Sequence, residues 1–206
     1  DNTPYSPELR DTIYDMQIRQ DWLSEYRKLN LAMDEISYIG AFSQDMNVEQ
    51  LVEKAYSLLG IEKGWQIREA DPFAFIRSRL EAIGITVFVN GVVGSNNKRK
   101  LLVEEFRGFT LLDSYAPIIF INGRDSNNGK LFTLIHEFCH ILLGKEGVSD
   151  SSSEPYCNMF AGEFLVPESL FHSRWSESPE VYEQIAKYFK VSQYVIYRVA
   201  LTHGYI

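Results

Sequence analysis

The segment that most constrains the fold of this chain is FTLIHEFCHILLG, residues 132–144. It is apolar on nearly every side, which predicts a helix buried in the core rather than one at the surface. Three titratable side chains nevertheless lie within it, because His136 and His140 are four residues apart and Glu137 follows the first histidine. Burial of such groups without strong partners costs several kcal/mol, so this helix needs something that binds them.

Two histidines at this spacing lie one helical turn apart on the same face, so both imidazole rings can bind one metal ion. The pattern His-Glu-x-x-His on a helix is a signature of zinc metalloproteases. Glu137 points about 100° away from His136 around the helix. It is therefore placed to exchange protons with a water molecule at the metal rather than to bind the metal. The less specific interpretation is a buried helix whose histidines only make hydrogen bonds.

A catalytic zinc site needs a third protein ligand, and the next predicted helix, residues 154–166, offers two glutamates. Glu154 and Glu163 fall on opposite edges of its apolar face, so helical geometry alone does not choose between them. Asn158 follows Glu154 by one turn and could accept the second ring N–H of a metal-bound histidine, which favours Glu154. His172 is a weaker candidate. We expect Glu154 to be the third ligand, with Asn158 behind one of the histidines.

The composition is that of an ordinary globular domain, and it narrows the possible partners. The chain has 206 residues and a formal net charge of -8, which disfavours broad binding to nucleic acids. Its two cysteines, Cys139 and Cys157, form no disulfide framework, which indicates a reducing compartment. The sequence has neither an apolar run of membrane length nor an apolar signal segment. We therefore expect a cytoplasmic protein without a membrane partner.

Hydrophobic periodicity divides the chain into helices, then strands, then helices. This order predicts an α+β fold in which a small, mostly antiparallel sheet packs on helices. Helical spacing and capping residues occur, outside the motif helix, in segments 8–31, 47–60, 71–84, 154–166, 181–190 and 193–204. Strand-like segments are residues 85–89, 101–113 and 117–122, and residues 90–91 supply a turn. Residues 96–100 are interpreted as a solvated hairpin loop and residues 149–153 as a serine-rich loop.

These elements predict a helical N-terminal region (1–66), a metallopeptidase core (67–172) and a C-terminal helical pair (173–206). The pair has the apolar rhythm and short turn of a helix-turn-helix. The outward face of its second helix would carry Gln193, Tyr194, Tyr197 and Arg198. Because this tail is barely basic, we expect the pair to pack against the core or to bind a partner protein. Direct DNA binding is not expected.

Three segments of the chain carry a resemblance to a known family. These are FRGFTLLDSYAPIIFIN (residues 106–122), the motif segment itself, and EPYCNMFAGEFLVP (residues 154–167). Together they resemble the ImmA/IrrE family of zinc-dependent metallopeptidases, over roughly residues 70–170. The family pattern after the histidine motif falls here on Glu154, Asn158, Phe160, Ala161, Leu165 and Pro167. Cys157 stands where alanine is commoner in the family.

The resemblance implies a zincin-like core, of the gluzincin kind, that holds one zinc ion per chain on His136, His140 and Glu154, with Glu137 as the catalytic acid/base. It implies cleavage of a helix-turn-helix transcriptional repressor, which switches on stress-response or mobile-element genes. Many relatives carry an N-terminal helix-turn-helix domain, but residues 8–31 here predict one long helix instead. The alternative function is a regulatory module that binds and displaces a repressor without cleaving it, with the metal serving stability.

Overall fold

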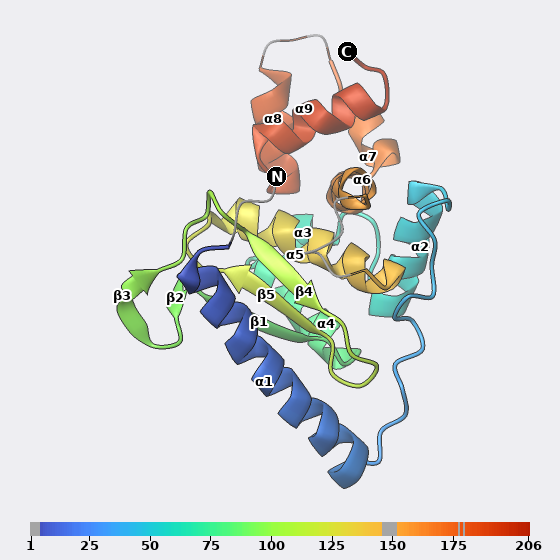
Figure 1. Cartoon of the computed structure of the whole chain (residues 1–206). Coiled ribbons are helices and arrows are strands. Elements are labelled where there is room, and N and C mark those ends of the chain that lie inside the picture. Colours follow the sequence, from blue (N-terminus) through green and yellow to red (C-terminus); the bar gives the residue numbers. More distant parts are fainter. Residues whose placement is uncertain (1–4, 146–151, 177, 179) are drawn as a thin grey trace.

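The computed structural model describes residues 5–145, 152–176, 178 and 180–206, and its helices and small sheet confirm the α+β class (Figure 1). The central sheet contains three strands in the order β1 (Thr86–Asn90), β5 (Ile118–Asn122) and β4 (Gly108–Leu111). Strand β1 runs parallel to β5, and β4 runs antiparallel to β5. The sheet is therefore mixed. The parallel pair is possible because the connection between β1 and β5 is long enough for both strands to run in the same direction.

The central strand β5 is buried on both faces, which explains its continuous apolar sequence. Side chains alternate between the two faces of a strand. Ile119 and Ile121 accordingly join the larger core on the helical side, whereas Ile118 and Phe120 join a smaller cluster on the other side. That smaller cluster includes Leu9 of the long N-terminal helix. The sheet thus forms a layer between α1 and the remaining helices (Figure 1).

Helix α1 (Pro7–Asn30) is the single long helix that its sequence predicts, and the Ser6 side chain caps its first turn. Its buried face is not the one that its largest residues suggest. Trp22 and Leu29 are 65% and 77% exposed, and the ring of Tyr26 stacks on that of Trp22 at the surface. The buried residues of α1 are instead two apolar and three polar ones: Leu9, Met16, Thr12, Gln20 and Ser24.

A polar side chain holds α1 against the sheet layer. Gln20 is buried, and its Nε2 donates to the carbonyl oxygens of Leu111 and Ala116 at 3.0 and 2.9 Å. These two carbonyls lie at the end of β4 and just before β5. Because Gln20 donates to both carbonyl oxygens, the face of α1 that contains it can be buried. The spacing of apolar residues alone does not reveal this face.

The other helices build the larger core. They are α2 (Val48–Leu59), α3 (Trp65–Arg68), α4 (Pro72–Ala82), α5 (Asn127–Leu143), α6 (Glu154–Leu165), α7 (Glu168–His172), α8 (Val181–Phe189) and α9 (Gln193–Thr202). Helix α5 packs against β4 and β5 on one side and against α6 on the other. Helix α6 also contacts α2 and α9, so it lies between α5 and the C-terminal pair (Figure 1). None of the described helices is long and apolar enough to span a membrane.

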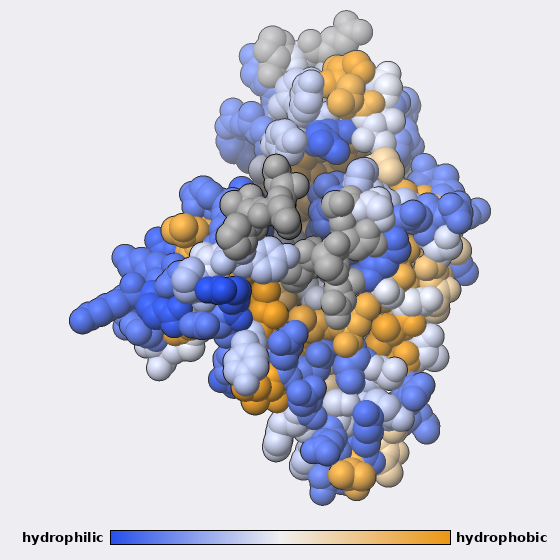
Figure 2. Space-filling view, in the orientation of Figure 1, coloured by the Kyte–Doolittle hydropathy of each residue, from blue (hydrophilic) through white to orange (hydrophobic). Residues whose placement is uncertain are grey.

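The segment predicted as a solvated hairpin loop, residues 96–100, is a strand instead. It forms β3 (Asn96–Lys100), which pairs antiparallel with β2 (Val92–Val93). The sequence concealed this strand because nearly all of it faces solvent, so it lacks an apolar side; Figure 2 shows a hydrophilic surface over this hairpin. Residues 101–107 form turns rather than a strand. Most of the predicted serine-rich loop, residues 149–151, lies outside the described residues.

The Gln20 contact can be tested with Gln20→Met, which keeps the length of the side chain but removes its donor. Two buried carbonyl oxygens would lose their partner, so we expect the free energy of unfolding to fall by about 1–3 kcal/mol. The matched control is Gln17→Met on the exposed face of α1. Urea denaturation followed by circular dichroism measures both. Equal midpoints for the two variants would contradict the role assigned to Gln20.

Candidate active site

Three predicted residues converge at the contact between α5 and α6. His136 and His140 lie one turn apart on α5, and their Nε2 atoms are 3.1 Å apart. Glu154, the first residue of α6, places Oε2 at 3.2 Å from Nε2 of His136 and Oε1 at 3.3 Å from Nε2 of His140. The three side chains thus aim their donor atoms at one another, and they form a group that could hold a metal ion.

The spacing of these atoms fits a divalent metal ion. Two ligands that bind zinc at 2.0–2.1 Å with tetrahedral angles are about 3.3 Å apart. The observed separations of 3.1–3.3 Å lie close to that value. Two imidazole nitrogens and one carboxylate oxygen are also the donor types that suit zinc. The residues present therefore fit such a group.

The electrostatics of the group also favour a positive charge at its centre. Burial favours neutral imidazoles, but hydrogen bonds to Glu154 and the nearby negative charges outweigh it and raise the pKa of His136. In His140, hydrogen bonds to Cys157 and Glu154 overcome the same burial and raise the pKa to about 10. The two histidines lower the pKa of Glu154 to about 2. These shifts favour positive charge between the imidazoles and the carboxylate, which is the charge that a bound metal cation would supply.

Glu137 lies beside this group rather than in it. It lines a pocket of about 430 Å³ together with His136, Glu154 and Asn158, although only 5% of its surface is exposed. The hydroxyl of Thr110 on β4 donates to Oε2 of Glu137 at 2.8 Å, which fixes the carboxylate. Burial raises the pKa of Glu137, although the two histidines oppose this effect. A raised pKa makes this carboxylate a stronger proton acceptor, which is the property that a general base needs.

Gly108 allows β4 to approach α5 at the position of Glu137. A Cβ atom at Gly108 would lie 2.6 Å from Cγ2 of Thr133, 2.9 Å from the carbonyl oxygen of Phe120 and 3.3 Å from Cγ of Glu137. Any side chain at this position would therefore push the strand away from the helix. The glycine at the start of β4 thus brings Thr110, two residues further along, to within hydrogen-bonding distance of Glu137.

The other candidate ligands lie elsewhere and have partners of their own. The carboxylate of Glu163 accepts a hydrogen bond from the backbone N–H of Glu168 at 3.0 Å and lies 3.1 Å from Nε2 of His203. It therefore ties α6 to α7 and to the end of α9. His172, at the end of α7, places Nδ1 at 2.7 Å from the hydroxyl of Tyr205. Neither residue belongs to the group formed by the two motif histidines and Glu154.

Asn158 lines the same pocket as the two motif residues His136 and Glu137, but no described hydrogen bond joins its amide to a histidine. Its expected role behind a histidine remains a prediction. The hydroxyl of Ser153 lies nearer to such a position, at 3.5 Å from Nδ1 of His140. Sequence reasoning missed Ser153 and Thr110. The signal for Thr110 was a polar residue in an otherwise apolar strand, and for Ser153 it was a serine directly before α6.

The two cysteines lie behind the histidines, away from solvent. Cys139 and Cys157 are fully buried free thiols, one on α5 and the other on α6. Hydrogen bonds with Cys139 and His140 outweigh burial and lower the pKa of Cys157 to about 6. The thiol of Cys157 is therefore a further hydrogen-bond partner of His140, contributed by α6.

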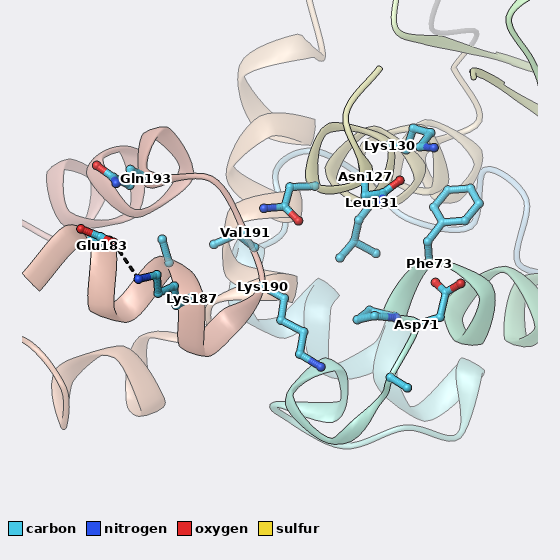
Figure 3. A pocket seen from close by; sticks show the side chains of 14 residues that line it. Asp71, Phe73, Asn127, Lys130, Leu131, Glu183, Lys187, Lys190, Val191 and Gln193 are labelled. Carbon is cyan, nitrogen blue, oxygen red and sulfur yellow. Dashed lines mark ion pairs between the residues drawn. The ribbon is translucent and has the colours of Figure 1, made fainter. Parts of the chain in front are cut away.

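A second cavity, of about 770 Å³, lies at the junction of α4, α5, α8 and α9 (Figure 3). Its lining includes Lys130, Lys187 and Lys190, and Lys187 is paired with Glu183 at 2.7 Å. It shares no lining residue with the pocket around the histidines. It contains none of the three residues that could hold a metal ion.

The group that could hold a metal ion and the family comparison together support a metallopeptidase-type function. The family model Peptidase M78, described as the IrrE N-terminal-like domain, matches residues 80–199. This is more than half of the 206 residues, so the chain belongs to this peptidase family, which confirms the resemblance drawn from its motifs. The match extends through α8 and most of α9. No curated protein matches the chain.

The choice between the two candidate glutamates can be tested by metal binding. Glu154→Gln should weaken the binding of Zn²⁺ to metal-free protein by at least roughly 10- to 100-fold, because it removes a ligand charge from the group. Glu163→Gln should leave the affinity unchanged, because its carboxylate bonds to Glu168 and His203 instead. Isothermal titration calorimetry measures both variants. Loss of affinity in Glu163→Gln alone would reverse the assignment.

Proposed function

We propose that this protein is a zinc-dependent endopeptidase that cleaves a regulatory protein in the cytoplasm. The observation that carries the proposal is the position of Glu137. Its carboxylate lies in the same pocket as His136 and Glu154, two of the three residues that could hold the metal, and it is held there by Thr110. A metal site that served only stability would not need a largely buried carboxylate that lines a pocket next to the metal ligands. Membership of a peptidase family supports the same conclusion.

In this proposal each side chain has a defined role. His136, His140 and Glu154 would hold the zinc ion, which when bound supplies Lewis-acid chemistry toward a peptide carbonyl. Glu137 takes a proton from the attacking water on its carboxylate and passes it to the leaving amine as the peptide bond breaks. Thr110 keeps that carboxylate turned toward the pocket. The apolar surroundings of α5 exclude bulk water and hold the two histidines rigidly.

The substrate we propose is a helix-turn-helix transcriptional repressor, and this part of the proposal rests on the family resemblance. Strand β4 supports binding of an extended polypeptide. It contributes Gly108 and Phe109 to the pocket that contains Glu137, and among the described strands it pairs only with β5. A substrate segment could add to its second edge through backbone hydrogen bonds. Its scissile carbonyl would then lie beside the three proposed metal ligands.

Glu137→Gln separates cleavage from metal binding. We expect the variant to keep its fold and zinc content but to lose cleavage by at least about 100-fold, because the amide cannot accept the proton. The wild-type protein and the variant are each loaded with zinc and incubated with lysate from the source cells. Labelling of newly formed protein N-termini followed by mass spectrometry identifies cleaved proteins, and zinc content is measured in parallel.

The outcomes of this experiment distinguish the two functions. New termini that require Glu137, in a helix-turn-helix repressor, would support the proposal. New termini only in other proteins would support the peptidase activity but contradict the proposal that the substrate is a repressor. If neither protein cleaves anything but a pull-down from the same lysate recovers the same repressor with both, the protein is a binding module that displaces its partner.

The hydrogen bond from Thr110 gives a finer test of how Glu137 works. Thr110→Val keeps the shape of the side chain but removes the hydroxyl donor, so the carboxylate loses its fixed orientation. We expect kcat to fall by roughly 10-fold, with unchanged zinc content. Thr110→Ser retains the hydroxyl and should keep most of the activity. A serine variant as impaired as the valine variant would show that packing, not the hydrogen bond, is what matters.

A further inference from the structure

The pocket that contains Glu137 continues into a second one. This neighbouring pocket has a volume of about 500 Å³, and four residues line both: Arg107, Phe132, Thr133 and Asn158. Because they share these residues, the two hollows adjoin each other, and together, as one cleft, they extend from β4 past α5 and α6 to α9. A polypeptide bound over the metal ligands would therefore extend along α9 in one direction. A volume of this size lies within the range of pockets that hold small ligands or side chains.

The far wall of this cleft is built by the C-terminal helix. Tyr194, Val195 and Arg198 of α9 line the second pocket, opposite Phe132 of α5 and Gly162 of α6. Val195 is buried, whereas Tyr194 is 66% exposed and stands at the rim. Two of these residues, Tyr194 and Arg198, belong to the face that the sequence suggested as the outward surface of a helix-turn-helix. In the folded chain both residues line the second pocket, and Arg198 also lines a further neighbouring hollow.

Charge changes sign along the cleft. The end near the metal ligands includes Glu104 and Glu105, whereas the described lining of the second pocket contains two arginines and no acidic side chain. One of these, Arg107, is neutralised by Asp125 at 2.8 Å. Within the part of the chain that the structure describes, the Arg198 guanidinium makes no ion pair or hydrogen bond. It is therefore available to a carboxylate of a bound molecule.

We infer that the pocket between α5, α6 and α9 is a specificity subsite for the substrate. It takes a large apolar side chain against Phe132, Tyr194 and Val195, and Arg198 binds the carboxylate of an acidic residue next to it. The inference rests on the proposed peptidase function and adds the sequence preference of that activity. It also gives α9 a role, since the family match includes both Tyr194 and Arg198.

A library of peptides derived from a whole proteome, digested with the zinc-loaded protein, tests the subsite. Mass spectrometry of the products gives the residues on each side of the cleaved bonds. For the wild type we expect enrichment of large apolar residues at one position and of Asp or Glu at an adjacent one. Arg198→Glu should change the ratio of acidic to basic residues at that adjacent position by about fivefold or more, and Arg198→Lys should retain the acidic preference.

Tyr194→Ala should weaken the apolar preference severalfold, because it removes one wall of the pocket. Tyr197→Ala is the matched control, since Tyr197 is an exposed tyrosine of the same helix that does not line the pocket. Cleavage with the same preferences in the wild type, Tyr194→Ala and Arg198→Glu would overturn the subsite but leave the peptidase intact. A wild type that cuts no more peptides than Glu137→Gln would overturn the proposed function and the subsite together.

Discussion

The convergence of His136, His140 and Glu154 is the interaction on which the rest of the structure depends. Helix α5 is enclosed by the sheet on one side and by α6 on the other, so its polar side chains must find partners inside the protein. The two imidazoles and the carboxylate interact electrostatically with one another, and a divalent cation between them would complete the arrangement. Close packing of α5 against α6 and the position of the charged group therefore require each other.

The sequence allowed much of this to be predicted because local patterns determine it. Helix α5 follows from its apolar run, and the caps at Asn47 and Asp71 follow from their side chains, which bond to the first turns of α2 and α4. The buried face of α1 could not be predicted, because it depends on Gln20 meeting two carbonyls 91 and 96 residues away in sequence. Strand β3 was missed since its residues lack the alternation that marks a half-buried strand.

The choice of Glu154 over Glu163 shows where local reasoning ends. Both glutamates lie on edges of one apolar face, and within α6 only the position of Asn158 favoured the edge of Glu154. What does distinguish them is the rotation of α6 relative to α5, which is fixed by its contacts with α2 and α9 on its other sides. With that rotation, Glu154 meets the histidines and Glu163 meets His203. Thr110 was concealed for a similar reason, because its partner Glu137 lies on a different element.

A chemical centre of this kind says little about which protein is cut. The groups that would bind the metal and transfer protons act on the peptide bond, which is the same in every substrate. Discrimination must come from side chains that a substrate touches further along the cleft. At one end of the cleft these side chains belong to the segment before β4, and at the other end they belong to α9. The position of α9 depends on its packing against α6. The contact that turns Glu154 toward the histidines thus also sets the distance between the three proposed metal ligands and Arg198, so that in the proposed function chemistry and selectivity share one structural origin.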